Sequence, residues 1–425
     1  MDLVVNPSGR LEGNLAAPSS KSYSIRALLC GLLVDGRVEL GNVLVSRDTA
    51  AAMRVCEQLG GRLKLLDDDV IHVEGVGGEP KPRRPVVDCM NSGTTLRLAT
   101  AIASISSEPV SFTGDSSLRE RTLKPLEDAL TSLGVRVESR NGFPPVKVKG
   151  PVSGGRVSIP GDVSSQYISA LLMALPVVEG DSSIHVTGIL KSRPYIDLTL
   201  NALEGFGVRI ENRDYREFIV AGGQKYSARR YDVEGDYSSA AFILAAAALT
   251  DGEVGVGNLS QKSLQADKKI IEILDRMGAE VTVSEDKAVV AGDGSLQGVE
   301  VDLGDSPDLL PIVSVLGALS EGETRIVNTK HARIKECDRI TAMTRELSRM
   351  GADIREKPDG LEVDGGRLKG AIVDGWRDHR IIMSLAVAGL KASGETRIRD
   401  AGHIDVTYPN FTEDIKQLGG KVKWV

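Results

Sequence analysis

The segment 333–340, with the sequence RIKECDRI, has residue types and spacing that could do chemistry on an anionic molecule. It carries five charges of both signs in eight residues. Lys335 and Arg339 are four positions apart, so on a helix they would share a face, with Glu336 and Asp338 flanking it. An ordinary charge run is a solvated surface. At the start of an amphipathic helix (ITAMTRELSRMGA), this cluster instead indicates a site for an anionic substrate with a general acid.

Further polar clusters stand at equivalent places, each at the start of an apolar helix. They are Lys21-Ser22 with Arg26, Asn91 to Thr94 with Arg97, Ser164 to Gln166, Asp308, and Asp378 to Arg380. Short polar residues at these starts predict Ser, Asp and Asn helix caps. If all the helix N-termini point toward one cleft, their dipoles attract anions to it. PSSKS resembles the tail of a phosphate-binding loop, but the glycines of that motif are missing, which excludes a nucleotide-binding P-loop.

The elements that must position these clusters repeat six times along the chain. An apolar residue followed by Gly ends a helix and precedes a strand at positions 60, 134, 207, 278, 351 and 419, so the repeats are 68 to 74 residues long. Each Gly stands where a helix C-cap needs a positive φ. Each unit reads as helix, strand, helix and two short strands. A period near 70 is too short for independent domains, so we expect three units to share a core in each of two domains.

Composition excludes several classes of protein. The chain has 425 residues, of which 41% are hydrophobic and 26% charged, as in a globular protein. A formal charge of −7 and an aromatic content of 4% disfavour nucleic acid as a partner. The apolar runs are too short to span a bilayer, and the first residues, MDLVVNPSGR, do not form a signal peptide. The four cysteines (30, 56, 89 and 337) have no metal-binding spacing, which indicates reduced thiols in the cytoplasm and no metal site.

Taken in order along the chain, the motifs resemble those of the 5-enolpyruvylshikimate-3-phosphate synthases. The matching motifs are PSSKSYSIRA, NSGTTLR, RERTLKPL, GDVSSQYISALL, SRPYIDLTL, VEGDYSSAAFILAAAAL, RIKECDRITAM and DHRIIMSLA. The resemblance covers nearly the whole chain. It implies an α/β (α+β) fold, a two-domain inside-out α/β barrel with six βαβαββ repeats, three per domain around a pseudo-threefold axis. One domain would comprise residues 1–18 and 235–425, the other residues 19–234, with the active site in the cleft between them.

The resemblance also implies the reaction and its site. The 5-hydroxyl of shikimate 3-phosphate would add to C2 of phosphoenolpyruvate, and the tetrahedral intermediate would lose phosphate, with no metal or organic cofactor. Asp308, Glu336 and Lys21 would be catalytic, with the division of proton transfer among them left open. Implied shikimate 3-phosphate contacts are Lys21, Ser22, Arg26, Ser164, Ser165, Gln166, Ser192, Tyr195, Asp308, His331 and Lys335. Implied phosphoenolpyruvate contacts are Lys21, Asn91, Gly93, Arg121, Gln166, Arg339 and Arg380. Glyphosate would compete with phosphoenolpyruvate, and the chain would act as a monomer.

Two positions depart from the pattern of well-known bacterial members. His331 stands where an Asn contacts the sugar-like ligand, and Val406 stands where a Lys precedes Thr-Phe/Tyr-Pro. His403 and Lys416 are the nearest cationic candidates to replace that lysine. Arg97 falls within the TTLRLATAIA helix and is expected to be structural.

Two other functions would fit parts of the sequence. The sister transferase acting on UDP-N-acetylglucosamine normally has a catalytic Cys on a mobile loop, and the corresponding segment here, GDSSLRERTLKPL, contains none. A non-catalytic repeat scaffold that binds nucleic acid would explain six repeats. It would not explain Asp308, Glu336 and six cations at motif positions.

Overall fold

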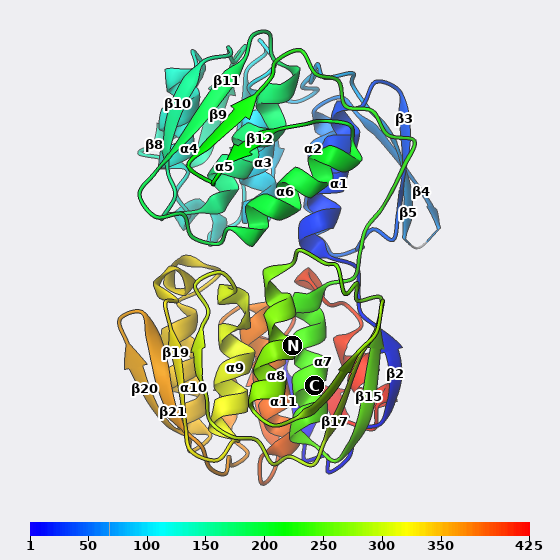
Figure 1. Ribbon diagram of the computed structural model, residues 1–425, viewed down its shortest axis with the longest axis vertical. Helices are drawn as coiled ribbons and strands as arrows, with labels where there is room; N and C mark the ends of the chain where they lie inside the picture. The colour runs from blue at the N-terminus through cyan, green and yellow to red at the C-terminus, as the bar shows by residue number, and fades with distance from the viewer. Residues whose placement is uncertain (68) are drawn as a thin grey trace. The chain divides into compact units, whose positions relative to one another are not determined.

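The chain divides into two compact units. A computed structural model of the chain describes residues 1–67 and 69–425 (Figure 1). Unit 1 comprises Met1–Pro18 and Glu234–Val425, and unit 2 comprises Ser19–Val233. Each unit contains helices and four-stranded sheets in alternation, and the α/β class predicted from the sequence is confirmed.

Unit 2 contains three four-stranded sheets among its described residues. Their strand orders are β14-β3-β5-β4, β6-β7-β9-β8 and β10-β11-β13-β12. The strands are β3 (Arg37–Gly41), β4 (Arg62–Asp67), β5 (Val70–Glu74), β6 (Val86–Asp88), β7 (Val110–Thr113), β8 (Arg136–Arg140), β9 (Phe143–Lys149), β10 (Arg156–Pro160), β11 (Ser182–Thr187), β12 (Glu211–Arg213), β13 (Glu217–Val220) and β14 (Arg230–Asp232). The helices are α1 (Lys21–Leu33), α2 (Arg47–Gln58), α3 (Gly93–Ala103), α4 (Lys124–Ser132), α5 (Ser165–Ala174) and α6 (Pro194–Gly205), with short 3-10 turns η1 (Leu118–Glu120) and η2 (Leu175–Val177).

Unit 1 repeats the same plan. Its sheets have the orders β16-β17-β15-β2, β18-β19-β21-β20 and β22-β23-β1-β24. The strands are β1 (Leu3–Asn6), β2 (Gly13–Ala16), β15 (Gly252–Gly257), β16 (Glu280–Val283), β17 (Ala288–Gly292), β18 (Glu300–Asp302), β19 (Glu323–Val327), β20 (Asp353–Lys357), β21 (Gly360–Asp364), β22 (Ile372–Asp374), β23 (Thr396–Arg399) and β24 (Lys421–Trp424). The helices are α7 (Tyr237–Leu249), α8 (Lys269–Arg276), α9 (Leu310–Ala318), α10 (Arg339–Arg349), α11 (His379–Lys391) and α12 (Phe411–Gln417), with turns η3 (Ala266–Lys268), η4 (Pro307–Leu309), η5 (Lys330–Ile334) and η6 (Ile404–Val406).

Every sheet has one parallel pair followed by two antiparallel pairs, as a βαβαββ repeat requires. In one repeat, for example, β6 pairs in parallel with β7, while β9 lies antiparallel between β7 and β8. The chain completes two repeats with distant strands. β2 pairs in parallel with β15, and β14 pairs in parallel with β3. Each of these two strands, β2 and β14, is the last strand before the chain passes into the other unit.

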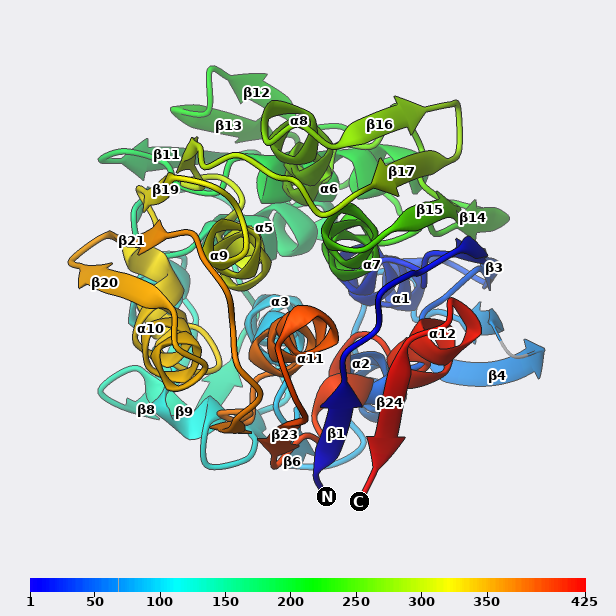
Figure 2. The same cartoon turned by 90° about the horizontal axis from the view of Figure 1, so that it is seen from below.

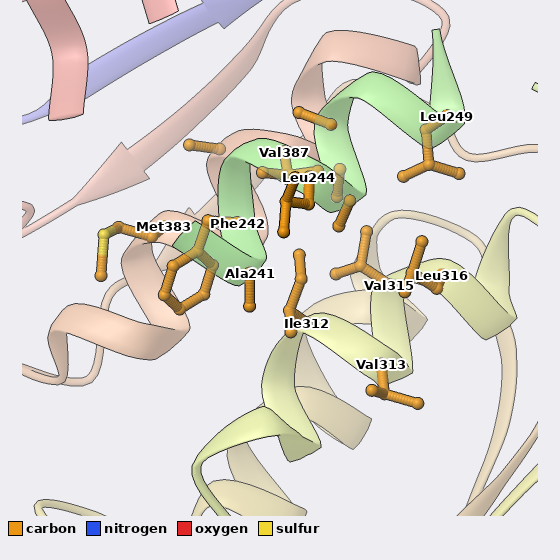
Figure 3. Close-up of a cluster of buried hydrophobic side chains, with 14 of the residues drawn as sticks. Ala241, Phe242, Leu244, Leu249, Ile312, Val313, Val315, Leu316, Met383 and Val387 are labelled. Atoms are coloured by element: carbon orange, nitrogen blue, oxygen red, sulfur yellow. The ribbon is translucent and has the colours of Figure 1, made fainter. Parts of the chain in front are cut away.

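The core of unit 1 lies among its three inner helices. α7, α9 and α11 stand at the centre of this unit, and the sheets lie outside them (Figure 2). Their apolar side chains point toward one another, with Phe242 and Leu244 of α7 near Ile312 of α9 and Met383 of α11 (Figure 3). α7 is almost wholly apolar and buried on every side, because it is surrounded by two helices and the β15–β17 sheet.

The predicted helix ends are confirmed with one exception. The six glycines at positions 60, 134, 207, 278, 351 and 419 all adopt a positive φ, between 77° and 112°. Side chains of Ser20, Ser92, Ser164, Asp236 and Asp378 cap α1, α3, α5, α7 and α11. The prediction is wrong for α9, whose start has no side-chain cap. The chain enters α9 from the 3-10 turn η4, so its N-cap is Leu309, whose side chain has no oxygen to accept from an N–H.

Candidate active site

Arg339 is the centre of a buried charged cluster in unit 1, made of Asp308, Lys335, Glu336, Arg339, Asp378 and Arg380 and called here the Asp308 cluster. Its guanidinium donates through Nη1 to Asp308 Oδ1, through Nη2 to Glu336 Oε2 and through Nε to Asp378 Oδ2, each at 2.7 Å. The side chain is 1% exposed. A planar guanidinium presents five donors in a fixed fork, so a single arginine orients three carboxylates at once.

Asp308 is the carboxylate that contacts most of these cations. Arg380 Nη2 lies 3.0 Å from Asp308 Oδ2, and Lys335 Nζ lies 3.7 Å from Oδ1, in addition to the contact with Arg339. The Asp308 side chain is 14% exposed, so it can meet a ligand while it keeps these contacts. Three cations therefore surround a carboxylate that a ligand can still reach.

The expectation that Lys335 and Arg339 share a helix face is wrong. Lys335 follows the short turn η5, and α10 begins only at Arg339, with Asp338 as its N-cap. Asp338 accepts from the backbone N–H of Thr341 at 3.1 Å, which sets the start of the helix at this point. The two cations therefore do not share a helix face, although both contact Asp308 Oδ1.

Burial and charge act in opposite directions on the cations of the cluster. Burial lowers the pKa of Lys335, although the neighbouring carboxylate of Asp308 acts to raise it. Burial also acts to lower the pKa of Arg339, but the carboxylates of Asp378, Glu336 and Asp308 outweigh it and hold the pKa well above its usual range. Arg339 therefore remains charged at any accessible pH, whereas Lys335 loses its proton more readily than an exposed lysine.

In unit 2, two guanidinium groups converge on the first residue of α3. A Cβ atom added to Gly93 would lie 2.9 Å from Arg97 Nη1 and 3.1 Å from Arg121 Nη1. Arg97 Nη1 donates to Gln166 Oε1 at 2.6 Å, and Gln166 Nε2 donates to Thr94 Oγ1 at 3.0 Å. This Gly93 cluster (Gly93, Thr94, Arg97, Arg121 and Gln166) combines two positive charges with a helix N-terminus, which is an arrangement suited to an anion.

Asn91 joins the same group of side chains from the loop before α3. It donates through Nδ2 to Asp115 Oδ2 at 2.7 Å, and Arg121 Nη2 lies 3.5 Å from its Oδ1. Tyr167 of α5 donates to the carbonyl of Thr122 at 2.6 Å, which ties the segment of Arg121 to α5. The structure thus brings together the predicted residues Asn91, Gly93, Arg121 and Gln166.

Arg26 links α1 to α6 within unit 2. It is 1% exposed and donates to Thr199 Oγ1 at 2.9 Å, to the carbonyl of Ser22 at 2.9 Å and to the carbonyl of Tyr195 at 3.1 Å. Burial lowers the pKa of its guanidinium. Lys21, the first residue of α1, forms an ion pair with Asp48 Oδ2 at 3.3 Å. Ser22, Arg26 and Tyr195 therefore meet as predicted neighbours, and Lys21 is held beside them at the helix start.

The remaining predicted residues lie at helix starts and turns. Ser164 caps α5 and Ser165 begins it, while Ser192 has a φ of 55° in the loop before α6. His331 lies in η5, which packs against the turn η4 that carries Asp308. Val406 is 6% exposed in η6, and the nearby Lys416 lies on α12 with its ammonium 4.0 Å from Glu413.

Sequence reasoning missed three residues that hold the site together. Asp378 was grouped with Arg380 but was given no role, and it accepts from Arg339. Asp48 pairs with Lys21, and Arg97, taken as structural, donates to Gln166. Position gave some signal for the arginine, because residue 97 lies four positions after Gly93 and one helical turn places both on one face. Nothing in the sequence pairs residue 48 with residue 21.

Two kinds of feature are not found among the residues that the structure describes. No group of three or more His, Cys, Asp or Glu side chains in 1–67 and 69–425 is arranged to hold a metal ion. Within the same ranges, no helix combines the length and apolar character needed to cross a membrane.

Comparisons with known proteins agree on one family. The family model described as EPSP synthase (3-phosphoshikimate 1-carboxyvinyltransferase) matches residues 5–415. The chain is 44% identical to the 3-phosphoshikimate 1-carboxyvinyltransferase of Methanocaldococcus jannaschii and 47% identical to that of Halobacterium salinarum, with 99% of each chain covered in both comparisons. It is also similar to the structure of EPSP synthase from Acinetobacter baumannii, with a TM-score of 0.86, 26% identity and 99% of each chain covered.

Proposed function

This chain belongs to the EPSP synthase family, and we propose that the Asp308 cluster and the residues at the starts of α1, α3 and α5 carry out the reaction of that family. The chain is a 3-phosphoshikimate 1-carboxyvinyltransferase. It transfers the enolpyruvyl group of phosphoenolpyruvate to the 5-hydroxyl of shikimate 3-phosphate and releases phosphate, a step in the biosynthesis of aromatic amino acids.

Charge is the first requirement of these substrates. Each carries a carboxylate and a phosphate, so together they bring roughly six negative charges if each phosphate carries about two. Six cations stand at the proposed contacts, namely Lys21, Arg26, Arg121, Lys335, Arg339 and Arg380. Arginine suits phosphates and carboxylates because its fork can make two parallel hydrogen bonds.

We assign the contacts by substrate. Shikimate 3-phosphate is bound by Lys21, Ser22, Arg26, Ser164, Ser165, Gln166, Ser192, Tyr195, Asp308, His331 and Lys335. Phosphoenolpyruvate is bound by Lys21, Asn91, Gly93, Arg121, Gln166, Arg339 and Arg380. The convergence of Arg97 and Arg121 on Gly93 supports the second assignment, because a small anion placed there meets two guanidinium groups and the N-terminus of α3.

The proton transfers fall to the two carboxylates on Arg339. In the addition step, the 5-hydroxyl oxygen bonds to C2 of phosphoenolpyruvate, its proton passes to Asp308, and C3 receives a proton from Glu336. In the elimination step, the bond from C2 to the phosphate oxygen breaks, C3 returns a proton to Glu336, and the proton on Asp308 leaves with the released phosphate, which gives the enolpyruvyl ether. Lys21 stabilises the charge that collects on the departing phosphate.

The observation that carries this proposal is the hold of Arg339 on both carboxylates. Asp308 and Glu336 accept from the two terminal nitrogens of the same guanidinium, each at 2.7 Å. Acid–base groups must be placed within hydrogen-bond reach of the reacting atoms, and a rigid buried arginine places two of them relative to each other. Asp308 also contacts Lys335 and Arg380, so the proposed base lies among three cations of the cluster.

Phosphate release tests the activity directly. The protein should release phosphate when shikimate 3-phosphate and phosphoenolpyruvate are both present, and should release none when either is omitted. UDP-N-acetylglucosamine offered in place of shikimate 3-phosphate should give no phosphate. Release with the sugar nucleotide alone as acceptor would assign the chain to the sister reaction.

We further propose that the enzyme works as a monomer in the cytoplasm. Its four cysteines are free thiols, and Cys30, Cys56 and Cys89 are buried, where burial raises the pKa of each thiol and suppresses its reactivity. Light scattering after size-exclusion chromatography should give a mass near 45.3 kDa. Twice that mass would contradict the monomer.

A further inference from the structure

Asp267 is a buried carboxyl in unit 1 that the reaction proposed above does not use. It lies in η3 and is 2% exposed. The hydroxyl of Ser238 donates to its Oδ2, while its Oδ1 is buried and has no hydrogen-bond partner among the described residues. The turn that carries it is tied to the turn that carries Asp308, because Ser306 Oγ donates to the carbonyl of Ala266 at 2.9 Å.

Charged groups from three neighbouring elements act on this carboxyl. They are Asp308 of η4, Arg380 of α11 and Asp236 at the start of α7. On its own side of the fold, Lys268 and Lys269 donate to backbone carbonyl groups elsewhere, so neither neutralises it through those bonds. The carboxyl is therefore coupled by charge to two members of the Asp308 cluster without belonging to it.

Burial raises the pKa of Asp267 to about 7, and the negative charge of Asp308 acts in the same direction. Arg380 and the hydroxyl of Ser238 act to lower it. A buried carboxyl with one unpartnered oxygen is stable as a neutral acid, whereas its ionised form lacks a compensating partner on that oxygen. Asp267 thus changes charge within the working range of most enzymes.

That change alters the charge which a substrate meets. The Asp308 cluster contains three cations and three carboxylates, and with Glu336 protonated for the addition step its formal charge is +1. Ionised Asp267 adds one negative charge beside it. An approaching phosphate or carboxylate then meets a neutral group instead of a positive one, and the low dielectric of the interior strengthens the effect.

We propose that Asp267 is a positioning residue that acts through Asp308 and Arg380: its neutral form permits anionic substrate to bind at the Asp308 cluster, and its ionisation opposes that binding. This inference rests on the proposed function of the cluster. Substrate affinity then depends on the proton of Asp267, a carboxyl that does not take part in the reaction itself.

The test compares the pH dependence of kcat/KM for phosphoenolpyruvate in the wild type, Asp267→Asn and Asp275→Asn. Asn has the shape of the neutral acid, and Asp275 is an exposed aspartate of α8 in the same unit. From pH 5.5 to 8.5 the wild type and Asp275→Asn should lose activity through a transition that Asp267→Asn lacks. At pH 8.5 the Asn variant should exceed the wild type by roughly three- to thirtyfold, the range expected for one charge several ångströms away. If the ratio of kcat/KM in Asp267→Asn to kcat/KM in the wild type stays constant from pH 5.5 to 8.5, the proposal is overturned.

A second variant guards against a folding defect in the first. The Ser238 hydroxyl stabilises ionised Asp267, so Ser238→Ala should move the same transition to higher pH and leave the plateau at low pH unchanged. A transition that does not move would contradict the role of Asp267. Asp308→Asn separates the two claims: near-wild-type turnover in that variant would refute the site itself, whereas a normal loss there with unaltered pH profiles in the Asp267 and Ser238 variants would refute only this inference.

Discussion

Arg339 Nη1 lies 2.7 Å from Asp308 Oδ1, and the arginine side chain is 1% exposed. This contact makes the arginine part of the acid–base machinery as well as a source of positive charge, because the same guanidinium also holds Glu336 and Asp378. A buried charge left without its partner is costly. Loss of Arg339 should therefore disturb all three carboxylates that it contacts.

The first prediction concerns the shape of that guanidinium. Arg339→Lys keeps the charge, but one ammonium group cannot reach three carboxylates in the same geometry. We expect kcat to fall by about a hundredfold or more. Arg355→Lys is the matched control, since Arg355 also contacts several carboxylates but is 43% exposed on β20. Equal, small losses in the two variants would show that charge alone matters at position 339.

The second prediction concerns Gly93. A methyl group there would lie 2.9 Å from Arg97 Nη1 and 3.1 Å from Arg121 Nη1, so both guanidinium groups must retreat. Gly93→Ala should raise KM for phosphoenolpyruvate about tenfold, equivalent to the loss of roughly 1.4 kcal/mol of binding. KM for shikimate 3-phosphate should change less. Gly9→Ala, where an added methyl meets nothing within 4 Å, should leave both constants unaltered.

The third prediction concerns Arg97 as a positioning residue for Gln166. Its Nη1 donates to Gln166 Oε1, which leaves the amide nitrogen to donate to Thr94. In an otherwise wild-type chain, Arg97→Lys should weaken the binding of phosphoenolpyruvate. In a chain that already carries Gln166→Ala, the same substitution should have little further effect. Such non-additivity is measured by a double-mutant cycle. Fully additive losses would mean that Arg97 acts independently of Gln166.

Much of the fold and part of the site could be predicted from the sequence, because they depend on local rules. A glycine at a helix C-cap and a Ser or Asp at an N-cap act within a few residues, and the predicted glycines and five of the six caps were confirmed. The error at Lys335 also comes from a local rule. A spacing of four residues predicts one helix face, but Asp338 caps α10 and so leaves Lys335 outside the helix.

Long-range pairing was out of reach of these rules. The pair of Lys21 with Asp48 and the contacts of Asp378 with Arg339 join residues that are distant in sequence, and residue types alone do not specify which carboxylate meets which cation. Asp267 gave no signal either, because an aspartate in SLQADKK reads as a surface residue. Its burial results from the packing of η3 against α7.

The fourth prediction follows from the raised pKa of Asp267, about 7 in the folded chain, against about 3.9 in an unfolded one. Between these values the folded state binds more protons, so this group makes the free energy of unfolding fall as pH rises from about 4 to 7. Asp267→Asn lacks that decline. The free energy of unfolding of this variant minus that of the wild type should therefore be larger at pH 8 than at pH 5. Urea denaturation at both pH values decides it. Asp275→Asn should show no such difference, and a constant gap between Asp267→Asn and wild type would be inconsistent with a buried neutral acid.

The central claim is that Asp308 and Glu336 transfer the protons of the enolpyruvyl reaction. Asp308→Asn and Glu336→Gln nearly preserve shape and remove the acid–base function, and Glu285→Gln supplies an exposed control in unit 1. The most direct measurement is kcat for phosphate release in these variants, taken together with the dissociation constants of shikimate 3-phosphate and phosphoenolpyruvate. We predict that kcat falls by about a hundredfold or more in both site variants, while the dissociation constants change by less than about tenfold and the control matches wild type. Near-wild-type kcat in both site variants would contradict the account.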